Sequence, residues 1–410
     1  MVRVTLRERS EMNRKTSLIL LLAMVVVLSV TLLAGCSSRP SYSDDPESLL
    51  NFVGKIVRWM HGWVGNYGWT VVVFTVFLKI ITLPLDFWQR ISTRKTSMMM
   101  SKMQPVLDEI DARYGKDPQR ANMEKQKVYK KYGFSTASSC LPMIITMVVF
   151  FVMFGGLTSY SNYNSVVNYQ NLSSHYNEQY MTLVKADENY IAYYNQLIAE
   201  GKEEEAAAQS ALRKFYENHK ETNQTYVNTA LDTIPEYYQQ NHESWLWIQN
   251  IWQPDTWSPI MVDYQKFISN FSNQDIENYV SEQQYNNIRE KVLSSTDRSW
   301  NGLMILPLMS VGLSFLSIFI SQKLDRRKDA PKPANDTQAA TNRTMMIMMP
   351  LMMAFFGFMY TGAFAIYMVF NYMLSIITTV ALKVPVDKIV SKSLAKAENL
   401  SSSQKESYKR

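Results

Sequence analysis

The feature that most constrains this chain is a set of long stretches without a charged side chain, at residues 139–157, 303–320 and 344–382. About 20 apolar residues are enough to cross a bilayer as a helix. The last stretch holds 39 residues and is interrupted by Thr361-Gly362, which indicates two short helices in a hairpin. A further apolar run, from Trp69 to Leu85, contains one cation, Lys79. Although the mean hydropathy of −0.18 would suit a soluble protein, this clustering predicts a helical membrane protein.

The N-terminus has the pattern of a secretory signal. Five basic residues lie within the first 15 positions, and the apolar stretch 18–33 follows them. The next residues, "LAGC", place Cys36 after small residues, as in a bacterial lipobox. We expect cleavage before Cys36 and acylation of its sulfur, for example with palmitate. An ordinary signal anchor with a chance cysteine is the alternative.

The charges of the connecting segments predict the orientation in the membrane. Segments 86–137, 323–343 and 383–410 hold 11, 6 and 7 Lys+Arg against 6, 3 and 3 Asp+Glu. Segment 159–302 holds 9 against 19, a net charge of 9 − 19 = −10. Because basic residues in short loops mark the cytoplasmic side, we expect a bacterial plasma-membrane protein with a lipid-anchored N-terminus outside and its C-terminus in the cytoplasm.

This gives an all-α integral membrane protein with five transmembrane helices, a cytoplasmic helical hairpin and a mostly helical extracellular insertion. The expected parts are a signal peptide (1–35), an extracellular N-terminal segment (36–66), TM1 (67–85), the hairpin (86–137), TM2 (138–158), the extracellular domain (159–302), TM3 (303–322), a cytoplasmic loop (323–343), TM4 (344–360), TM5 (363–382) and a basic cytoplasmic tail (383–410).

Turn and cap residues predict some of the helix ends. In the hairpin, Gly115 and Gly133 end two charged helical patterns, and Pro118 is well placed to begin the second helix. In the extracellular domain, the stretch 196–222 predicts one helix.

Polar residues in the spans recur at helical spacing. Thr75, Lys79, Thr82 and Asp86 share one face of the first span. Ser310, Ser314, Ser317 and Ser321 repeat this spacing in the third span, and Tyr367, Asn371, Ser375 and Thr378 repeat it in the fifth. The second span contributes Thr146. These stripes predict the lining of a polar groove; close helix packing with hydroxyls bonded inside their own helices is the alternative.

Lys79 decides in favour of the groove. A cation at bilayer depth costs about 2.5–3.5 kcal/mol on insertion scales, and such residues usually face a bundle interior or a watery cavity. Asp86 lies two turns away, which we take as too distant for the obvious neutralising partner. The sequence therefore predicts a hydrated, positively charged groove around Lys79.

The chain shows none of the patterns of enzyme chemistry. Its four histidines are scattered, and we find no metal-ligand pair, nucleophile elbow or phosphate-binding glycine loop. If Cys36 is acylated, Cys140 alone remains, so no disulfide framework is expected. We expect a protein that is not an enzyme, with no cofactor and no metal.

Several motifs in order resemble the YidC/Oxa/Alb family of membrane protein insertases. They are "FLKIITLPLDFWQ", "MMMSKMQPVLDEIDARYGKDPQRANMEKQKVYKKYGF", "CLPMIITMVVFFVMF", "LWIQNIWQPDTW", "ILPLMSVGLSFLSIFISQKL" and "MMIMMPLMMAFFGFMYTGAFAIYMVFNYMLSII". They cover about half of the chain. The form resembled is the five-span lipoprotein of Gram-positive bacteria.

The resemblance implies a groove that is open to the cytoplasm and to lipid but closed to the outside, with Lys79 at the position of the family's groove cation. It also implies nascent membrane proteins as clients and ribosome–nascent-chain complexes and the Sec translocon as partners; no specific nucleic-acid sequence is implied. The family usually has Arg where Lys79 stands and often Gln where Thr146 stands. Lysine keeps the charge but loses the planar fork of donors.

We therefore predict an insertase and chaperone that moves polar flanks of membrane proteins through the groove. A solute or ion transporter or channel could use the same polar path, but the sequence shows no internal symmetry of the kind transporters carry. A surface lipoprotein with an acidic outer domain is a third possibility.

Overall fold

The computed structural model describes residues 45–407 except 115–116, 132–135, 273–275, 277–278, 297–299, 326–354 and 356–357. The predicted signal peptide and Cys36 lie outside the described residues, as do nearly all of the predicted TM4 and of the loop before it. Within the described part every regular element is helical, and the β-pairing consists of two isolated bridges. This confirms the all-α prediction.

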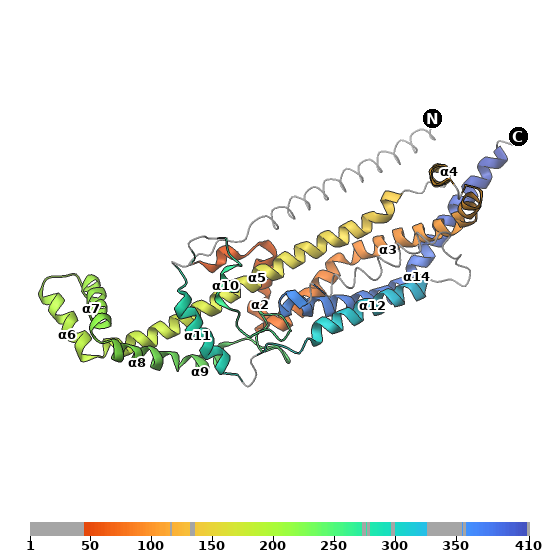
Figure 1. The fold of residues 1–410 in the computed structure, drawn as a ribbon. Coiled ribbons are helices and arrows are strands. Elements are labelled where there is room, and N and C mark those ends of the chain that lie inside the picture. The colour runs from red at the N-terminus through yellow and green to blue at the C-terminus, as the bar shows by residue number, and fades with distance from the viewer. Residues whose placement is uncertain are drawn as a thin grey trace, which may run out of the picture.

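Three of the described helices are long and apolar enough to cross a membrane. They are α3 (Tyr67–Tyr114), α12 (Ile305–Asp325) and α14 (Gly362–Ser407), with candidate spans at Tyr67–Lys95, Ile305–Leu324 and Gly362–Ser393. Helix α14 packs against both α3 and α12. These helices form the bundle on one side of the elongated molecule (Figure 1).

Helix α5 (Thr136–Lys185) joins the bundle to the rest of the molecule. Its 50 residues run without interruption, so it is about 75 Å long at the rise of an α-helix. The predicted TM2 is therefore the first part of a longer rod, which continues to the α6–α7 end of the molecule (Figure 1). Against its middle pack the short η1 (Pro46–Leu49) and α2 (Phe52–Val64).

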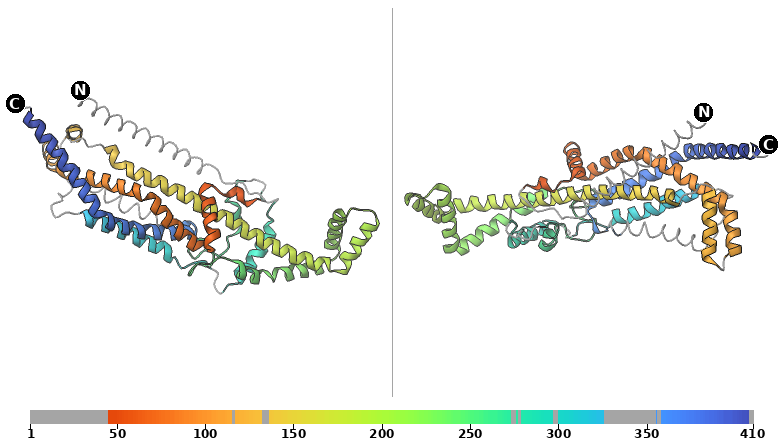
Figure 2. Two further views of the ribbon diagram at one scale, coloured as in Figure 1. Left: turned by 180° about the vertical axis from the view of Figure 1, so that it is seen from behind. Right: turned by 90° about the horizontal axis from the view of Figure 1, so that it is seen from above.

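The two arms of the predicted hairpin are both helical, and they pack against each other. The first arm is the end of α3, and the second arm is α4 (Pro118–Lys131), which begins at the predicted proline. Because α3 is continuous, TM1 and the first arm are a single helix. The hairpin projects sideways from the long axis of the molecule (Figure 2, right).

Among the described residues of segment 159–302, six helices follow α5. In chain order they are α6 (Glu188–Ala199), α7 (Glu204–Asn218), α8 (Lys220–Leu231), α9 (Ile234–Asn241) and, after a loop, α10 (Tyr264–Ile268) and α11 (Glu282–Ser294). Two apolar cores hold them. One joins α5 to α9, α10 and α11, and the other joins the end of α5 to α6 and α7.

The prediction of one helix over 196–222 is wrong. Gly201 has φ = +84°, in the left-handed region, and breaks the stretch between α6 and α7. A second break at His219 separates α7 from α8. Glycine adopts a left-handed backbone without steric cost, and the chain uses this to turn α7 back onto α6.

Candidate functional site

The first span presents two different faces. Thr75 is fully buried in the bundle, and Lys79, Thr82 and Asp86 follow it on the same side, each partly covered. The opposite side is apolar and exposed, with Val73, Val76, Phe77, Ile80, Ile81 and Leu83. An apolar exposed face on a membrane span is the face for lipid. The polar stripe predicted from the sequence therefore faces the other helices.

Lys79 and Asp86 form an ion pair, which corrects the expectation that Asp86 is too distant. The ammonium Nζ of Lys79 lies 2.6 Å from Oδ2 of Asp86, and the two side chains are 13% and 22% exposed. Seven residues complete two helical turns to within about 20° and separate the two Cα atoms by about 10 Å along the axis. The long lysine chain spans most of this distance, which a count of turns alone ignores.

The contact between these two groups lacks the angles of a hydrogen bond. Oδ2 of Asp86 is buried, and no donor among the described residues is aligned with it. The attraction between Lys79 and Asp86 is therefore mainly that of two charges in contact. A largely buried pair without full hydrogen bonding recovers only part of the free energy that its desolvation costs.

The polar stripe continues beyond Asp86 and reaches α14. Arg90 donates from Nη2 to the carbonyl oxygen of Ser375 at 3.4 Å and to Oγ1 of Thr378 at 3.3 Å. One turn further, Nε of Arg94 donates to Oδ1 of Asp387 at 2.8 Å. Sequence reasoning missed both arginines, although their spacing from Asp86 by four and eight residues continues the predicted stripe.

Several of the predicted groove hydroxyls are bonded within their own helices. Thr75 donates to the carbonyl oxygen of Val71 at 2.6 Å. In α12, Ser310 donates to Pro307 at 2.8 Å and Ser314 to Val311 at 2.7 Å, and both serines are buried. These contacts match the packing alternative for the stripes.

The remaining candidates divide by helix. On α14, Tyr367 is buried and lies within electrostatic range of Asp86, while Asn371 and Ser375 are half-buried. On α3, Thr82 makes a long contact of 3.4 Å with the carbonyl oxygen of Lys79. Ser317 of α12 is half-buried. Thr146 belongs to α5, but its side chain lies outside the described part of the chain.

The opposite end of the bundle is packed with aromatic rings. Tyr67, at the start of α3, stacks on Trp252 with ring centroids 4.3 Å apart, and Tyr160 of α5 closes the cluster. Glu243 holds this end together, since Oε2 accepts from the backbone N–H of Tyr67 at 3.1 Å and Oε1 lies 3.1 Å from Nε2 of His61. The side chains on the inner face of α3 are thus fully buried at Tyr67 and become partly exposed toward Asp86.

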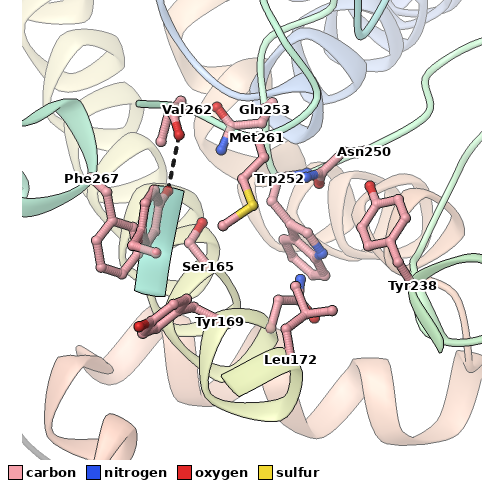
Figure 3. A pocket seen from close by; sticks show the side chains of 12 residues that line it. Ser165, Tyr169, Leu172, Tyr238, Asn250, Trp252, Gln253, Met261, Val262 and Phe267 are labelled. Atoms are coloured by element: carbon pink, nitrogen blue, oxygen red, sulfur yellow. Dashed lines mark hydrogen bonds between the residues drawn. The ribbon is translucent and has the colours of Figure 1, made fainter. Parts of the chain in front are cut away.

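A cavity of about 50 Å³ lies in the 159–302 segment (Figure 3). It is lined by Ser165, Asn168, Tyr169, Leu172, Tyr238, Asn250, Trp252, Gln253, Met261, Val262, Phe267 and Tyr285. None of these side chains is charged. The volume corresponds to a few water molecules, so the cavity is too small for a polypeptide segment, and the Lys79–Asp86 pair is the stronger candidate site.

Fold and site together define an all-helical membrane protein that keeps a charged pair within its spans. Residues 59–388 match the model of the family described as "60Kd inner membrane protein". This match covers most of the 410 residues, and the chain belongs to that family. It is a multi-pass bacterial membrane protein.

Similar curated proteins carry the name "Membrane protein insertase YidC". The one from Caldanaerobacter subterraneus subsp. tengcongensis is 34% identical over 114 residues, which are 28% of this chain and 53% of the relative. The one from Campylobacter jejuni is 34% identical over 100 residues, 24% of this chain and 18% of the relative. The one from Wolinella succinogenes is 30% identical over 123 residues, 29% of this chain and 22% of the relative. The aligned part is thus about half of the first relative and a smaller share of the others.

Proposed function

We propose that this protein is a membrane protein insertase that catalyses no bond chemistry. Its clients are nascent membrane proteins, and it acts as a chaperone for their spans. The family and the names of the relatives support this class of activity. The observation that carries the mechanism is the Lys79–Asp86 pair, because a membrane span does not keep ionised groups at this depth without a use for them.

The position of Lys79 suits a role part-way across the bilayer. It lies 12 residues after Tyr67, the first residue of α3, or about 18 Å along the helix. The hydrocarbon core is about 30 Å thick. A charged and hydrated site at this depth reduces the thickness of hydrocarbon that a polar segment next to the client's span must cross.

The burial of α3 supports entry from one side. The half that begins at Tyr67 is sealed by the aromatic cluster with Trp252, whereas Lys79, Thr82 and Asp86 are partly exposed. Polar chain can therefore reach the pair from the hairpin side while the other end stays closed. The apolar segment of the client then moves into lipid, and its burial there drives release.

The topology belongs to the same proposal. Five spans, a lipid anchor at Cys36 after removal of residues 1–35, and a cytoplasmic hairpin and tail agree with the basic segments 86–137, 323–343 and 383–410. The Sec translocon and ribosome–nascent-chain complexes are the partners that this orientation would present to the hairpin and the tail.

Insertion into vesicles that contain the purified protein tests the proposal. We expect Lys79→Ala to impair insertion of a single-span client with an acidic translocated flank, because the cation that offsets the flank's charge is lost. Lys79→Arg keeps the charge and is expected to stay active. Lys202→Ala, which removes an exposed lysine near Gly201, is the matched control.

Full activity of Lys79→Ala in this assay overturns the charged-groove mechanism. The same vesicles separate the insertase from a transporter or channel, since ion leakage without insertion would identify the latter.

A further inference from the structure

The acidic partner of Lys79 belongs to the protein itself. Among the described residues, Asp86 is the one carboxylate in ion-pair contact with Lys79. The pair is therefore close to neutral overall. This conflicts with a simple picture in which a free ammonium group waits for an acidic client.

The contact is built in a way that allows exchange. Oδ2 of Asp86 is buried and has no aligned donor within the described part of the chain. An ammonium group offers three donors, and an ionised carboxylate offers about four acceptor positions. The ammonium group of Lys79 therefore keeps donors that a second carboxylate with better geometry can use.

A second cation stands next to Asp86 on the same helix face. Arg90 follows at i+4, the spacing at which Asp and Arg on one helix interact. It also contacts Ser375 and Thr378 of α14, at 3.4 and 3.3 Å. An Asp86 side chain released from Lys79 is therefore still within one turn of a positive charge.

We propose that Asp86 is the resident counter-ion of Lys79, and that a carboxylate of the incoming polypeptide replaces it during insertion. Asp86 then sets specificity, because it neutralises Lys79 at rest and gives up Lys79 to flanks that carry an acid. This inference rests on the proposed insertase function and adds to it a specificity-determining residue.

The test measures two clients that differ only in the translocated flank, one with aspartates and one with asparagines at the same positions. The ratio of their insertion yields is compared among vesicles with wild-type protein, Asp86→Asn, Lys79→Ala and the double variant. Because each ratio is internal to one preparation, it does not depend on how much of a variant folds.

We expect Asp86→Asn to raise the ratio of acidic-client to neutral-client insertion about fivefold or more. Fivefold is the lower end of the typical effect of one bound group on the affinity for another. In the Lys79→Ala background, Asp86→Asn should leave the acidic-to-neutral ratio unchanged, because there is no ammonium group left to compete for. Asp86→Glu keeps the charge and should behave like the wild type.

Two results would overturn the inference. One is an unchanged or lower ratio in Asp86→Asn. The other is an equal rise with and without Lys79, since additive effects indicate simple repulsion of acids by Asp86 and no exchange. Asp86→Ser is a second neutral variant in case the asparagine variant does not fold. If the wild type inserts neither client, the proposed function fails; if it inserts both, only the role of Asp86 is at stake.

Discussion

Arg94 and Asp387 form an ion pair of 2.8 Å between residues that are 293 positions apart in the chain. Arg94 is 7% exposed and Asp387 is 28% exposed. The pair joins α3 to α14 just beyond the stripe that carries Lys79. It therefore fixes the two helices between which the candidate site lies.

The first prediction concerns this pair. Asp387→Ala should lower the free energy of unfolding by about 1–2 kcal/mol, below the upper value for hydrogen bonds to charged groups because Asp387 is partly exposed. Thermal unfolding in detergent, followed by tryptophan fluorescence, measures the change. Glu109→Ala is the matched control. Glu109 pairs with Arg113, and the side chains of Arg113 and Glu109 are 65% and 68% exposed. This pair should contribute almost nothing to the free energy of unfolding. Equal effects of the two variants would show that the α3–α14 pair is not structural.

Asp255 provides the second prediction, since it fixes the start of α12. Its buried carboxylate accepts hydrogen bonds from the backbone N–H groups of Leu303, Met304 and Leu306 and from the indole of Trp247, all between 2.8 and 3.2 Å. Asp255→Ala leaves these donors without an acceptor, so we expect a loss of about 3–5 kcal/mol.

The control for Asp255 is another aspartate at a helix start. Asp263 caps α10 through one bond to the N–H of Lys266 at 2.8 Å. Its replacement by alanine should cost about 1 kcal/mol. Comparing the yields and melting temperatures of the two alanine variants measures the difference. A melting temperature of Asp255→Ala equal to that of Asp263→Ala would contradict the prediction.

The third prediction compares two tyrosines that line the same cavity (Figure 3). Tyr285 is buried and donates to the carbonyl oxygen of Val262 at 3.0 Å. The hydroxyl of Tyr238 is also buried but has no partner among the described residues. Tyr285→Phe should therefore destabilise the protein by about 1 kcal/mol, whereas Tyr238→Phe should be neutral or stabilising. Melting temperatures decide, and the reverse order would show that the hydroxyl of Tyr238 is used.

The fourth prediction concerns pH and the α6–α7 end. Burial raises the pKa of Asp187, but hydrogen bonds from the hydroxyl of Tyr226 and from the N–H groups of Asn189 and Tyr190 outweigh it, so the pKa is lower in the folded state. A carboxyl group with a lowered pKa adds stability above its unfolded pKa, and this is lost as the pH falls through the folded pKa. Tyr226→Phe removes the 2.8 Å bond to Asp187.

We expect Tyr226→Phe to speed amide hydrogen exchange in α6 at neutral pH. The difference from the wild type should shrink as the pH falls through the lowered folded pKa of Asp187, because its carboxyl group then becomes protonated. A difference that stays constant at acid pH would place the effect in ring packing and not in the charge of Asp187.

Local patterns predicted much of the architecture. The uncharged stretches marked α12 and α14, and Pro118 marked the start of α4, because helix length and proline geometry act within a few residues. The break at Gly201 was missed, since the alanine-rich stretch after it favours a helix and only the packing of α7 onto α6 uses the left-handed glycine.

The sequence by itself determined which segments are apolar enough to enter a membrane and that Lys79 and Asp86 share a helix face, since both follow from composition and the 3.6-residue period. The tertiary structure decided which groups meet: Lys79 with Asp86, Arg94 with Asp387, and Asp255 with the start of α12. The physical reason is that an ionised or polar group in a dry interior must find its partner in space. Which partner a group meets depends on the length of its side chain and on how distant helices pack. The local sequence of one helix specifies neither of them.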